Sequence, residues 1–343
     1  MKKKGNGKNI VIILIIMAIV LYFVMKDDFN DIVDRLLTAD KWLILVGVLF
    51  MIGYWLLRSL ALYIVVKRYK KNIKYSKMLH QILITQFFNG ITPFATGGEP
   101  MQVYMLNKSG VKVAQATNII VQEFIMYQMA LVLMGLICLI LNFAFNICDV
   151  NPVLFHLILI GFIINIAVGL LSLFISFSKR FSKFIVNLSL KIGIKLKLIK
   201  NVEKTTALWN EKVEEYNESG TMLKENKKLF FTCVLTNLAA LLVFYMIPFF
   251  VFLSMGERVG IMQVVVSSSF ILLVGNFGPL PGGSGGIEGA FLEFFKVIIP
   301  FVDTREAILK SALIIWRVIT YYFGIVIGGV ALGFFKGDGK KCE

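Results

Sequence analysis

Long apolar runs are the feature that most restricts what this chain can fold into. A helix needs about 20 predominantly apolar residues to cross the hydrocarbon core of a bilayer. Hydrophobic residues make up 57% of the 343 residues, more than the core of a soluble protein of this size could bury. The sequence therefore predicts an all-α polytopic membrane protein and excludes a soluble enzyme. The runs that reach the required length are Trp42–Val66, Ala114–Leu141, Val153–Phe177, Leu229–Leu253 and Ser311–Phe335.

A shorter apolar run, Ile10–Met25, lies near the N-terminus and follows three lysines at 2–4. A secretory signal peptide has the same order of charge and apolar residues, but it ends in a small-residue cleavage site. Here the run is followed by Lys26 and Asp27 instead. We interpret it as an uncleaved first span of 16 residues, which brings the expected number of full spans to about six.

The charges between the runs predict the orientation. Lys67–Lys77 contains six basic residues and no acidic one, and Ser178–Lys228 contains twelve basic residues and six glutamates. Asn142–Pro152 contains no basic residue. Because Lys and Arg accumulate in cytoplasmic loops, both termini are expected in the cytoplasm. The net charge of +15 then belongs to a surface that faces anionic lipid, and nucleic-acid binding is not expected.

The long basic loop, residues 178–228, opens with apolar residues at helical spacing, among them Phe181, Phe184 and Leu188, with lysines between them. Such a pattern indicates an amphipathic helix. Two interpretations stay open: a helix lying on the inner leaflet, or a linker helix packed beneath the bundle.

Two further apolar stretches are interrupted by helix-breaking residues. Leu79–Leu106 has Asn-Gly-Ile-Thr-Pro-Phe-Ala-Thr-Gly-Gly-Glu-Pro at 89–100, and Ile261–Pro300 has a Gly- and Pro-rich centre at 275–288. Neither stretch can form one continuous helix. Irregular backbone at membrane depth must be buried in protein or line a wet cavity. We therefore expect two re-entrant hairpins of half-helices, with Gly/Pro tips.

The two stretches share a spacing that indicates an internal repeat. The flanking runs keep the same offset, which gives repeat 1 at about 42–141 and repeat 2 at about 229–335, within a single membrane domain of residues 1–343. The loop charges place the two hairpins on opposite sides, so the repeats are inverted, a pattern typical of transporters. Two unrelated Gly/Pro-rich turns are the alternative, and they do not explain the shared offset. The pairs recur after 187 to 189 residues: Asn89/Asn276, Pro93/Pro281, Gly97/Gly285, Gly98/Gly286 and Glu99/Glu288.

Ionisable residues in these apolar segments mark a candidate site, because a charge in a span usually has a partner or a function. Arg58, Glu123 and Arg317 lie in three different runs, and Glu99 and Glu288 lie on the hairpin tips. The arginines could hold a lipid phosphate and the carboxylates a cationic headgroup. The structural alternative is that Glu123 and Arg317 pair with each other and only pin two helices together.

The candidate substrate-binding residues are these charges, the hairpin tips and two tyrosines. The two His and four Cys residues show no metal-ligand spacing, so no metal and no cofactor are expected. Residues 275–286 lack the Lys-Ser/Thr of a phosphate-binding loop, and no catalytic residue is assigned. The candidates are Arg58, Asn89, Thr92, Pro93, Gly97, Gly98, Glu99, Glu123, Tyr127, Asn276, Pro281, Gly285, Gly286, Glu288, Arg317 and Tyr321.

These motifs carry a resemblance. Asn89-x3-Pro93-x3-Gly-Gly-Glu-Pro, followed by Glu123 on the next run, resembles the transmembrane region of lysylphosphatidylglycerol synthases. The second motif, 280–288, and Arg317-x3-Tyr321 are similar to that family's second half. The resemblance covers nearly the whole chain and implies a flippase-like domain. In multiple peptide resistance factors this region moves lysyl-phosphatidylglycerol to the outer leaflet, and a separate cytoplasmic domain transfers lysine from lysyl-tRNA.

Three functions are compatible with this resemblance. The first is a flippase for an aminoacylated or other polar-headgroup phospholipid in a bacterial cytoplasmic membrane. The second is a phosphatidylglycerol lysyltransferase; only Lys336–Glu343 follow the last run, so the soluble transferase domain is expected to be absent. The third is a scaffold that docks a separate lipid aminoacyltransferase. The expected partners are membrane phospholipid, such a transferase and a second copy of the chain.

Overall fold

The computed structural model describes most of the chain as helices. In the described part no residue lies in a β-strand. The described residues are 29–149, 151–178, 205–210, 226–275, 285–299 and 305–335, with a few separate positions between 180 and 214. The helices are α2 (Phe29–Thr38), α3 (Lys41–Tyr69), α4 (Tyr75–Ile91), η1 (Pro93–Ala95), α5 (Gly98–Lys108), α6 (Val113–Phe145), α7 (Pro152–Phe177), α10 (Lys227–Tyr245), α11 (Ile247–Ser254), α12 (Ile261–Gly275), α13 (Gly286–Lys296), α14 (Arg305–Arg317), η3 (Val318–Tyr322) and α15 (Phe323–Gly333).

Five helical segments within the described ranges are long and apolar enough to cross a membrane. They coincide with the five long apolar runs of the sequence, so a multi-pass helical membrane protein is confirmed. The expected first span, Ile10–Met25, lies outside the described residues. The total of about six spans therefore stays a prediction, as does the insertion of either hairpin into a membrane. The five segments are Lys41–Tyr69, Val113–Phe145, Pro152–Phe174, Lys227–Ser254 and Arg305–Gly333.

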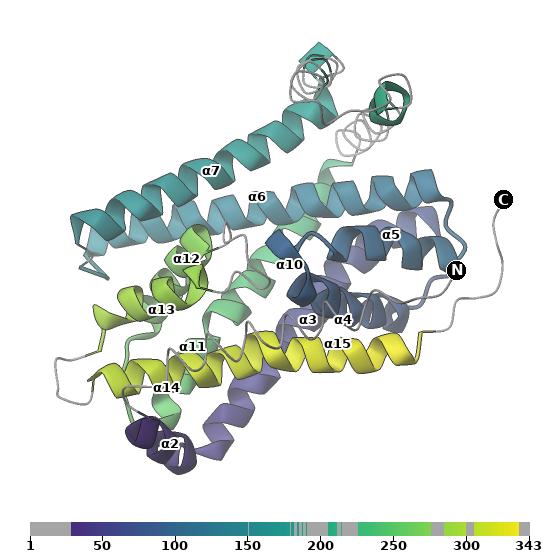
Figure 1. Ribbon diagram of the computed structural model, residues 1–343. Helices are drawn as coiled ribbons and strands as arrows, with labels where there is room; N and C mark the ends of the chain where they lie inside the picture. Colours follow the sequence, from purple (N-terminus) through teal and green to yellow (C-terminus); the bar gives the residue numbers. More distant parts are fainter. Residues whose placement is uncertain are drawn as a thin grey trace.

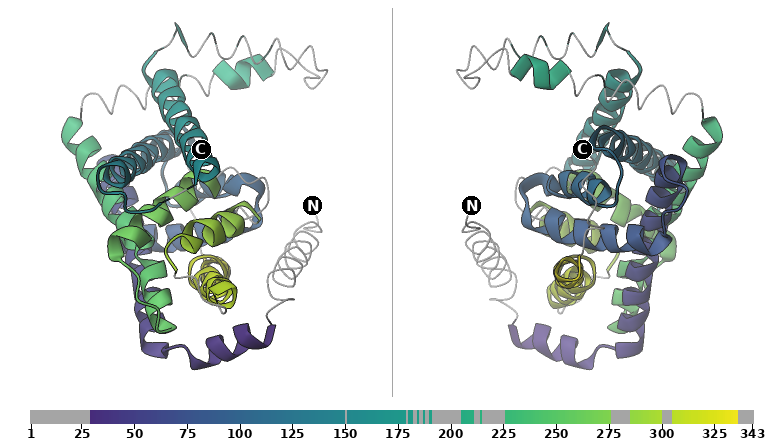
Figure 2. Two further views of the ribbon diagram at one scale, coloured as in Figure 1. Left: turned by 90° about the vertical axis from the view of Figure 1, so that its left-hand side faces the viewer. Right: turned by 90° about the vertical axis from the view of Figure 1, so that its right-hand side faces the viewer.

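Helix α3 shows how local chemistry sets the limits of a span. The carboxylate of Asp40 accepts a hydrogen bond from the backbone N–H of Trp42 at 2.8 Å and caps the first turn. Lys67 and Arg68 lie in the last turn, where cations favour the helix dipole. Over its length α3 packs along α10 and α11, and these helices lie together along one side of the molecule (Figure 2).

The first broken stretch forms a helical hairpin, α4 and α5 joined through η1. The hydroxyl of Thr92 accepts a hydrogen bond from the Gly97 N–H at 2.9 Å and closes the tip. A Cβ atom on Gly98 would lie 2.2 Å from the Asn89 side-chain oxygen, so only glycine permits this approach of the two arms. Phe94 has the left-handed φ of 53°, which is strained for a residue with a side chain.

The two halves of the chain interlock (Figure 1). Helix α4 of the first half packs along α15 of the second, and α12 of the second half packs against α6 and α7. Glycines allow this close contact, as is common between membrane helices. A Cβ on Gly328 would lie 2.4 Å from the Leu83 carbonyl oxygen, and a Cβ on Gly161 would lie 2.4 Å from that of Leu273.

The last span is not a uniform α-helix. Helices α14 and α15 follow one axis across the molecule (Figure 1), but Val318–Tyr322 between them forms a π-helical turn. Such wide turns often occur at functional sites. The sequence gives no signal for this turn, which begins directly after Arg317. Most of the loop 178–228 lies outside the described residues, so the two interpretations of its opening segment stay open.

Candidate functional site

The first part of the candidate site is a buried ion pair between α3 and α6. The Arg58 guanidinium donates to the Glu123 carboxylate at 2.6 Å and to the Asn237 side-chain oxygen on α10 at 2.5 Å. The Arg58 side chain is 13% exposed and that of Glu123 is 6% exposed. The Tyr127 ring lies 4.0 Å from the guanidinium carbon. The positive charge of Arg58, on α3, is thus surrounded by the Glu123 carboxylate, the Asn237 amide and the Tyr127 ring, which come from α6 and α10.

Sequence analysis missed Asn237, which lies within the apolar run Leu229–Leu253. Inserting an amide side chain into a membrane costs free energy unless the amide has a partner. The presence of an asparagine in this apolar run was therefore the signal that could have identified Asn237. Asn237 comes from the second half of the chain, 179 residues from Arg58. The first ion pair is therefore completed across the boundary between the two halves.

The second ion pair joins α13 and α14. The Arg317 guanidinium lies 2.6 Å from one carboxylate oxygen of Glu288. The other oxygen accepts a hydrogen bond from the Gly285 N–H at 2.6 Å and so caps its own helix. Gly285 has φ of +86°, a conformation that glycine adopts without strain. Both oxygens of Glu288 are thus already in use, and a headgroup would have to displace one of these contacts.

Aromatic packing fixes the position of this second pair. Phe291 lies on α13 one turn after Glu288, and Trp316 immediately precedes Arg317. Their rings stack with centroids 4.9 Å apart, and the Tyr321 ring lies 5.2 Å from the Arg317 guanidinium carbon. Since Phe291 and Trp316 are buried, the contact holds α13 against α14 and keeps the two charges aligned.

The structure corrects one alternative of the sequence analysis. Glu123 and Arg317 are both buried, at 5% and 6% exposure, but they do not pair with each other. Glu123 pairs with Arg58, and Arg317 pairs with Glu288. Each half of the chain contains its own arginine–glutamate pair. The two helices that carry Glu123 and Arg317 are therefore not pinned by a direct bond between these charges.

The tip of the first hairpin forms one wall of an open cavity of about 630 Å³. Helix α6 forms the facing wall, and most of the lining is apolar. Phe94 and Val103 contribute from the hairpin, and Val121 and Phe124 contribute from α6. Glu99, in the first turn of α5, is the charged residue of this lining.

Glu99 differs from the other two carboxylates. It has no ion-pair partner among the residues that the structure describes, and it is half-buried. It is close enough to Arg58 and Glu123 to interact with both charges electrostatically. A carboxylate without a bonded cation, in a mostly apolar cavity, can accept hydrogen bonds from a cationic or hydroxylated group.

The remaining candidates fall into four groups. The first group forms the tip of the first hairpin and determines its backbone conformation; it consists of Asn89, Thr92, Pro93, Gly97 and Gly98. The hydroxyl of Tyr321, in the π-helical turn, donates to the backbone oxygen of Gly90 at 2.9 Å and so ties the last span to that hairpin. Gly286 begins α13. The last group, Asn276 and Pro281, lies outside the described residues.

No group of three or more His, Cys, Asp or Glu side chains in the described ranges could hold a metal ion.

The family of the lysylphosphatidylglycerol synthase TM region matches residues 9–328, which is most of the chain. The chain belongs to this family. The resemblance noted in the sequence is thus confirmed, and it extends over both hairpins and both ion pairs.

Similar proteins occur in archaea and in a bacterium. A UPF0104 membrane protein of Archaeoglobus fulgidus is 22% identical over 94% of this chain and 95% of its own length. A UPF0104 membrane protein of Methanothermobacter thermautotrophicus is 23% identical over 97% of this chain and 96% of its own length. An uncharacterized protein of Mycoplasma genitalium is 22% identical over 95% of this chain and 88% of its own length. The two archaeal names describe membrane proteins, in agreement with the spans seen here.

Proposed function

We propose that this protein moves a phospholipid with a polar headgroup between membrane leaflets without changing it chemically. The observation that carries the proposal is the cavity at the tip of the first hairpin, which combines a mostly apolar lining with the carboxylate of Glu99. A phospholipid has the matching combination of an apolar body and a polar head. The description of the family, which refers to lysylphosphatidylglycerol synthase, suggests the substrate class: an aminoacylated lipid whose ammonium groups Glu99 would attract.

Further features support transport. The chain has a broken helical segment in each half, and each half has a buried arginine–glutamate pair beside its hairpin. Paired broken helices at a repeat interface are typical of transporters that expose one site alternately to two sides. We further propose that both termini face the cytoplasm, because the basic segment 67–77 belongs on that side. A separate lipid aminoacyltransferase would supply the aminoacylated lipid.

The test is leaflet exposure of labelled lipid in proteoliposomes that contain the purified protein. Three headgroups are compared: lysyl-phosphatidylglycerol, phosphatidylglycerol and phosphatidylcholine. We expect lysyl-phosphatidylglycerol to cross fastest, and Glu99→Gln to slow it by about tenfold, because a charge-assisted hydrogen bond is lost. The same variant should leave phosphatidylglycerol within about twofold of its original rate, since that headgroup has no cation for the carboxylate to bind.

A matched control is Glu306→Gln, which removes a carboxylate from an exposed position on α14. In the described part of the chain its ion-pair partner is Lys310, one turn on, at 4.0 Å. It should leave all three rates unchanged. Equal rates with and without protein, for every headgroup, would reject transport. In that case the scaffold function would be tested next, by co-purification with a lipid aminoacyltransferase.

A further inference from the structure

A second cavity lies along α6, toward the end of that helix that is far from α5 (Figure 1). Its volume is about 580 Å³, within the roughly 300–1,000 Å³ of sites that enclose a small molecule. Residues of the first half of α6 line the cavity beside Glu99, whereas residues of its last turns line this one. This α6–α7 cavity is lined by Asn142, Phe143, Cys148, Asp149, Phe155 and Phe270, among others.

Hydrogen bonds hold the loop between α6 and α7 that borders this cavity. The side-chain oxygen of Asn142 accepts a hydrogen bond from the backbone N–H of Cys148 at 2.8 Å. The buried thiol of Cys148 donates to the Gln263 backbone oxygen at 3.7 Å, and the Gln263 side-chain amide donates to the Ile147 backbone oxygen at 3.4 Å. The backbone before Asp149 is thus tied to both α6 and α12, which fixes where Asp149 lies.

Asp149 supplies the charge of the α6–α7 cavity. Its side chain is exposed and forms no ion pair with any residue that the structure describes. Positions 113–178 contain no Lys or Arg, and Glu123 is the only other acidic residue among them. No Lys or Arg of α6 or α7 therefore neutralises Asp149, and the cavity attracts a positively charged ligand.

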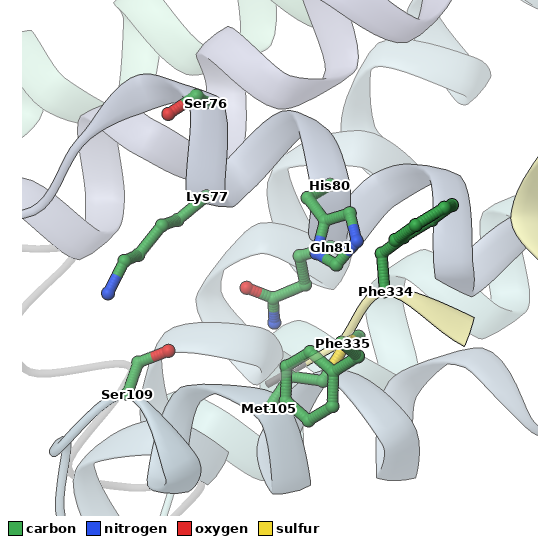
Figure 3. Close-up of a pocket in the computed structure, with 8 residues that line it drawn as sticks. All are labelled: Ser76, Lys77, His80, Gln81, Met105, Ser109, Phe334 and Phe335. Atoms are coloured by element: carbon green, nitrogen blue, oxygen red, sulfur yellow. The ribbon is translucent and has the colours of Figure 1, made fainter. Parts of the chain in front are cut away.

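A smaller cavity near the base of the first hairpin has the reverse charge (Figure 3). Its volume is about 240 Å³, and it lies where α4, α5 and the end of α15 meet. Lys77 and His80 belong to its lining, and no carboxylate is among the described lining residues. A cation is therefore disfavoured there and favoured in the α6–α7 cavity, where the described lining has Asp149 and no basic residue.

Three phenylalanines line the same cavity, one each from α6, α7 and α12. Phe270 on α12 is fully buried and packs on Phe294 with ring centroids 6.0 Å apart, so its place in the lining is fixed. Phe143 and Phe155 are 88% and 41% exposed, and a ligand can reach both rings. The face of an aromatic ring attracts a cation within about 6 Å of its centre. A carboxylate among aromatic rings is the chemistry that recognises ammonium groups with alkyl substituents.

We propose that the α6–α7 cavity binds an alkylammonium ion. The Asp149 carboxylate pairs with the charge, and the rings of Phe143 and Phe155 contact the alkyl groups. A soluble molecule and a lipid headgroup can both carry such an ammonium group, and the cavity recognises the chemistry that they share. The site goes beyond the proposed function, because binding here requires no movement of lipid between leaflets.

The test is equilibrium dialysis of the full chain in nonionic detergent against labelled choline, with dimethylbutanol as a neutral competitor of the same shape. Choline should bind about ten times more tightly than this isostere, because only choline carries a charge for Asp149. Asp149→Asn should weaken choline binding about tenfold, since an interaction with a charged group is lost. Asp34→Asn makes the same change at an exposed position on α2 outside the cavity and should alter binding by less than about twofold.

The contribution of the rings has its own matched pair of variants. Phe143→Leu should weaken choline binding about two- to fivefold, the size of a cation–π contact at an exposed site. Phe145 lies on the same helix, is 72% exposed and is not among the described lining residues. Phe145→Leu should therefore leave choline binding unchanged. Equal losses in the two variants would show that the rings do not contact the cation.

A second probe, short-chain phosphatidylcholine, separates the sources of the ammonium group. If it competes with choline and depends on Asp149 in the same way, the cavity accepts a lipid headgroup; if choline alone binds, the ligand is a soluble cation. Binding of neither probe, or equal binding of choline and its neutral isostere, overturns the site. Equal losses in Asp149→Asn and Asp34→Asn also overturn it, since binding would then follow overall charge. Choline binding by a protein that transports no lipid would overturn the proposed function and leave this site standing.

Discussion

Glu99 and Glu288 occupy matching positions near the starts of α5 and α13 but have different surroundings. Glu288 uses one oxygen for Arg317 and the other for its own helix N-terminus. Glu99 faces a mostly apolar cavity and has no ion-pair partner in the described part of the chain. Glu288 therefore holds α13 in position in the second hairpin, whereas Glu99 in the first hairpin is available to bind a ligand.

This difference predicts different losses of stability. Glu288→Gln breaks a buried ion pair and should lower the free energy of unfolding by about 3–5 kcal/mol, because the buried Arg317 loses this carboxylate. Glu99→Gln breaks no pair, so we expect a change of about 0.5 kcal/mol or less. Thermal unfolding in detergent, followed by tryptophan fluorescence, measures both. Similar melting temperatures for the two variants would contradict the assignment.

The pair of Arg58 and Glu123 makes a second prediction at this scale. Glu123→Leu leaves Arg58 buried without its carboxylate and should destabilise the protein by about 3–5 kcal/mol. Arg58→Met combined with Glu123→Leu removes both charges, and we expect the double variant to be more stable than Glu123→Leu alone. The double variant should still have lost lipid transport if the pair lines the transport route. Simple additivity of the two single losses would show that the charges are not coupled.

At the scale of the elements, the first hairpin depends on contacts between its arms that leave no space for a side chain. A Cβ on Gly98 would lie 2.2 Å from the Asn89 side-chain oxygen and 2.6 Å from the Thr85 methyl group. Both neighbours are side chains on α4, the other arm of the hairpin. The tip can therefore close only while position 98 is glycine or while the arms move apart.

Gly98→Ala should consequently destabilise the hairpin by about 1–3 kcal/mol, as overpacking does in protein cores. Gly289→Ala on α13 is the matched control, because nothing lies within 4 Å of the added Cβ. There the change should be neutral or stabilising by up to about 1 kcal/mol, since alanine favours a helix. Hydrogen exchange at residues 85–105 would locate the effect. A neutral Gly98→Ala would show that the arms are more loosely packed than the structure indicates.

At the scale of the whole molecule, the interlocking of the halves joins the hairpin of each to a span of the other. Tyr321 in the last span contacts Gly90 beside the first tip, and α12 packs against α6. A change in the angle between the halves would then move both hairpins together. This coupling is what a transporter of two inverted repeats would need.

The inversion itself can be tested by cysteine labelling. Cys138, Cys148 and Cys233 are buried, so a background in which Cys342 is replaced by serine should label little. In this background Ser109→Cys should react with an impermeant reagent from the cytoplasmic side, where the basic loops are expected. Asp303→Cys, at a position outside the described residues, should react from the opposite side. Labelling of both from the same side would reject the inverted repeat.

The sequence by itself determined the class of protein, the limits of the long helices and the breaks in the hairpins. These properties depend on local hydropathy and on the backbone preferences of glycine and proline, which act over a few residues. The five long runs match five helices, and the break predicted at 89–100 contains the tip of the first hairpin. The identity of the buried charges was also visible, because an ionisable residue stands out in an apolar run.

Only the tertiary structure decided which of these charges meet. Arg58 contacts Glu123 and Asn237, residues 65 and 179 positions away, because the rotation of three helices about their axes brings them to one point. The partner of Arg317 is Glu288 rather than Glu123 for the same reason, and Glu99 is left facing a cavity. Helix rotation is set by packing across the two halves, including glycine contacts such as Gly328 against Leu83. A pattern along the chain does not contain that information.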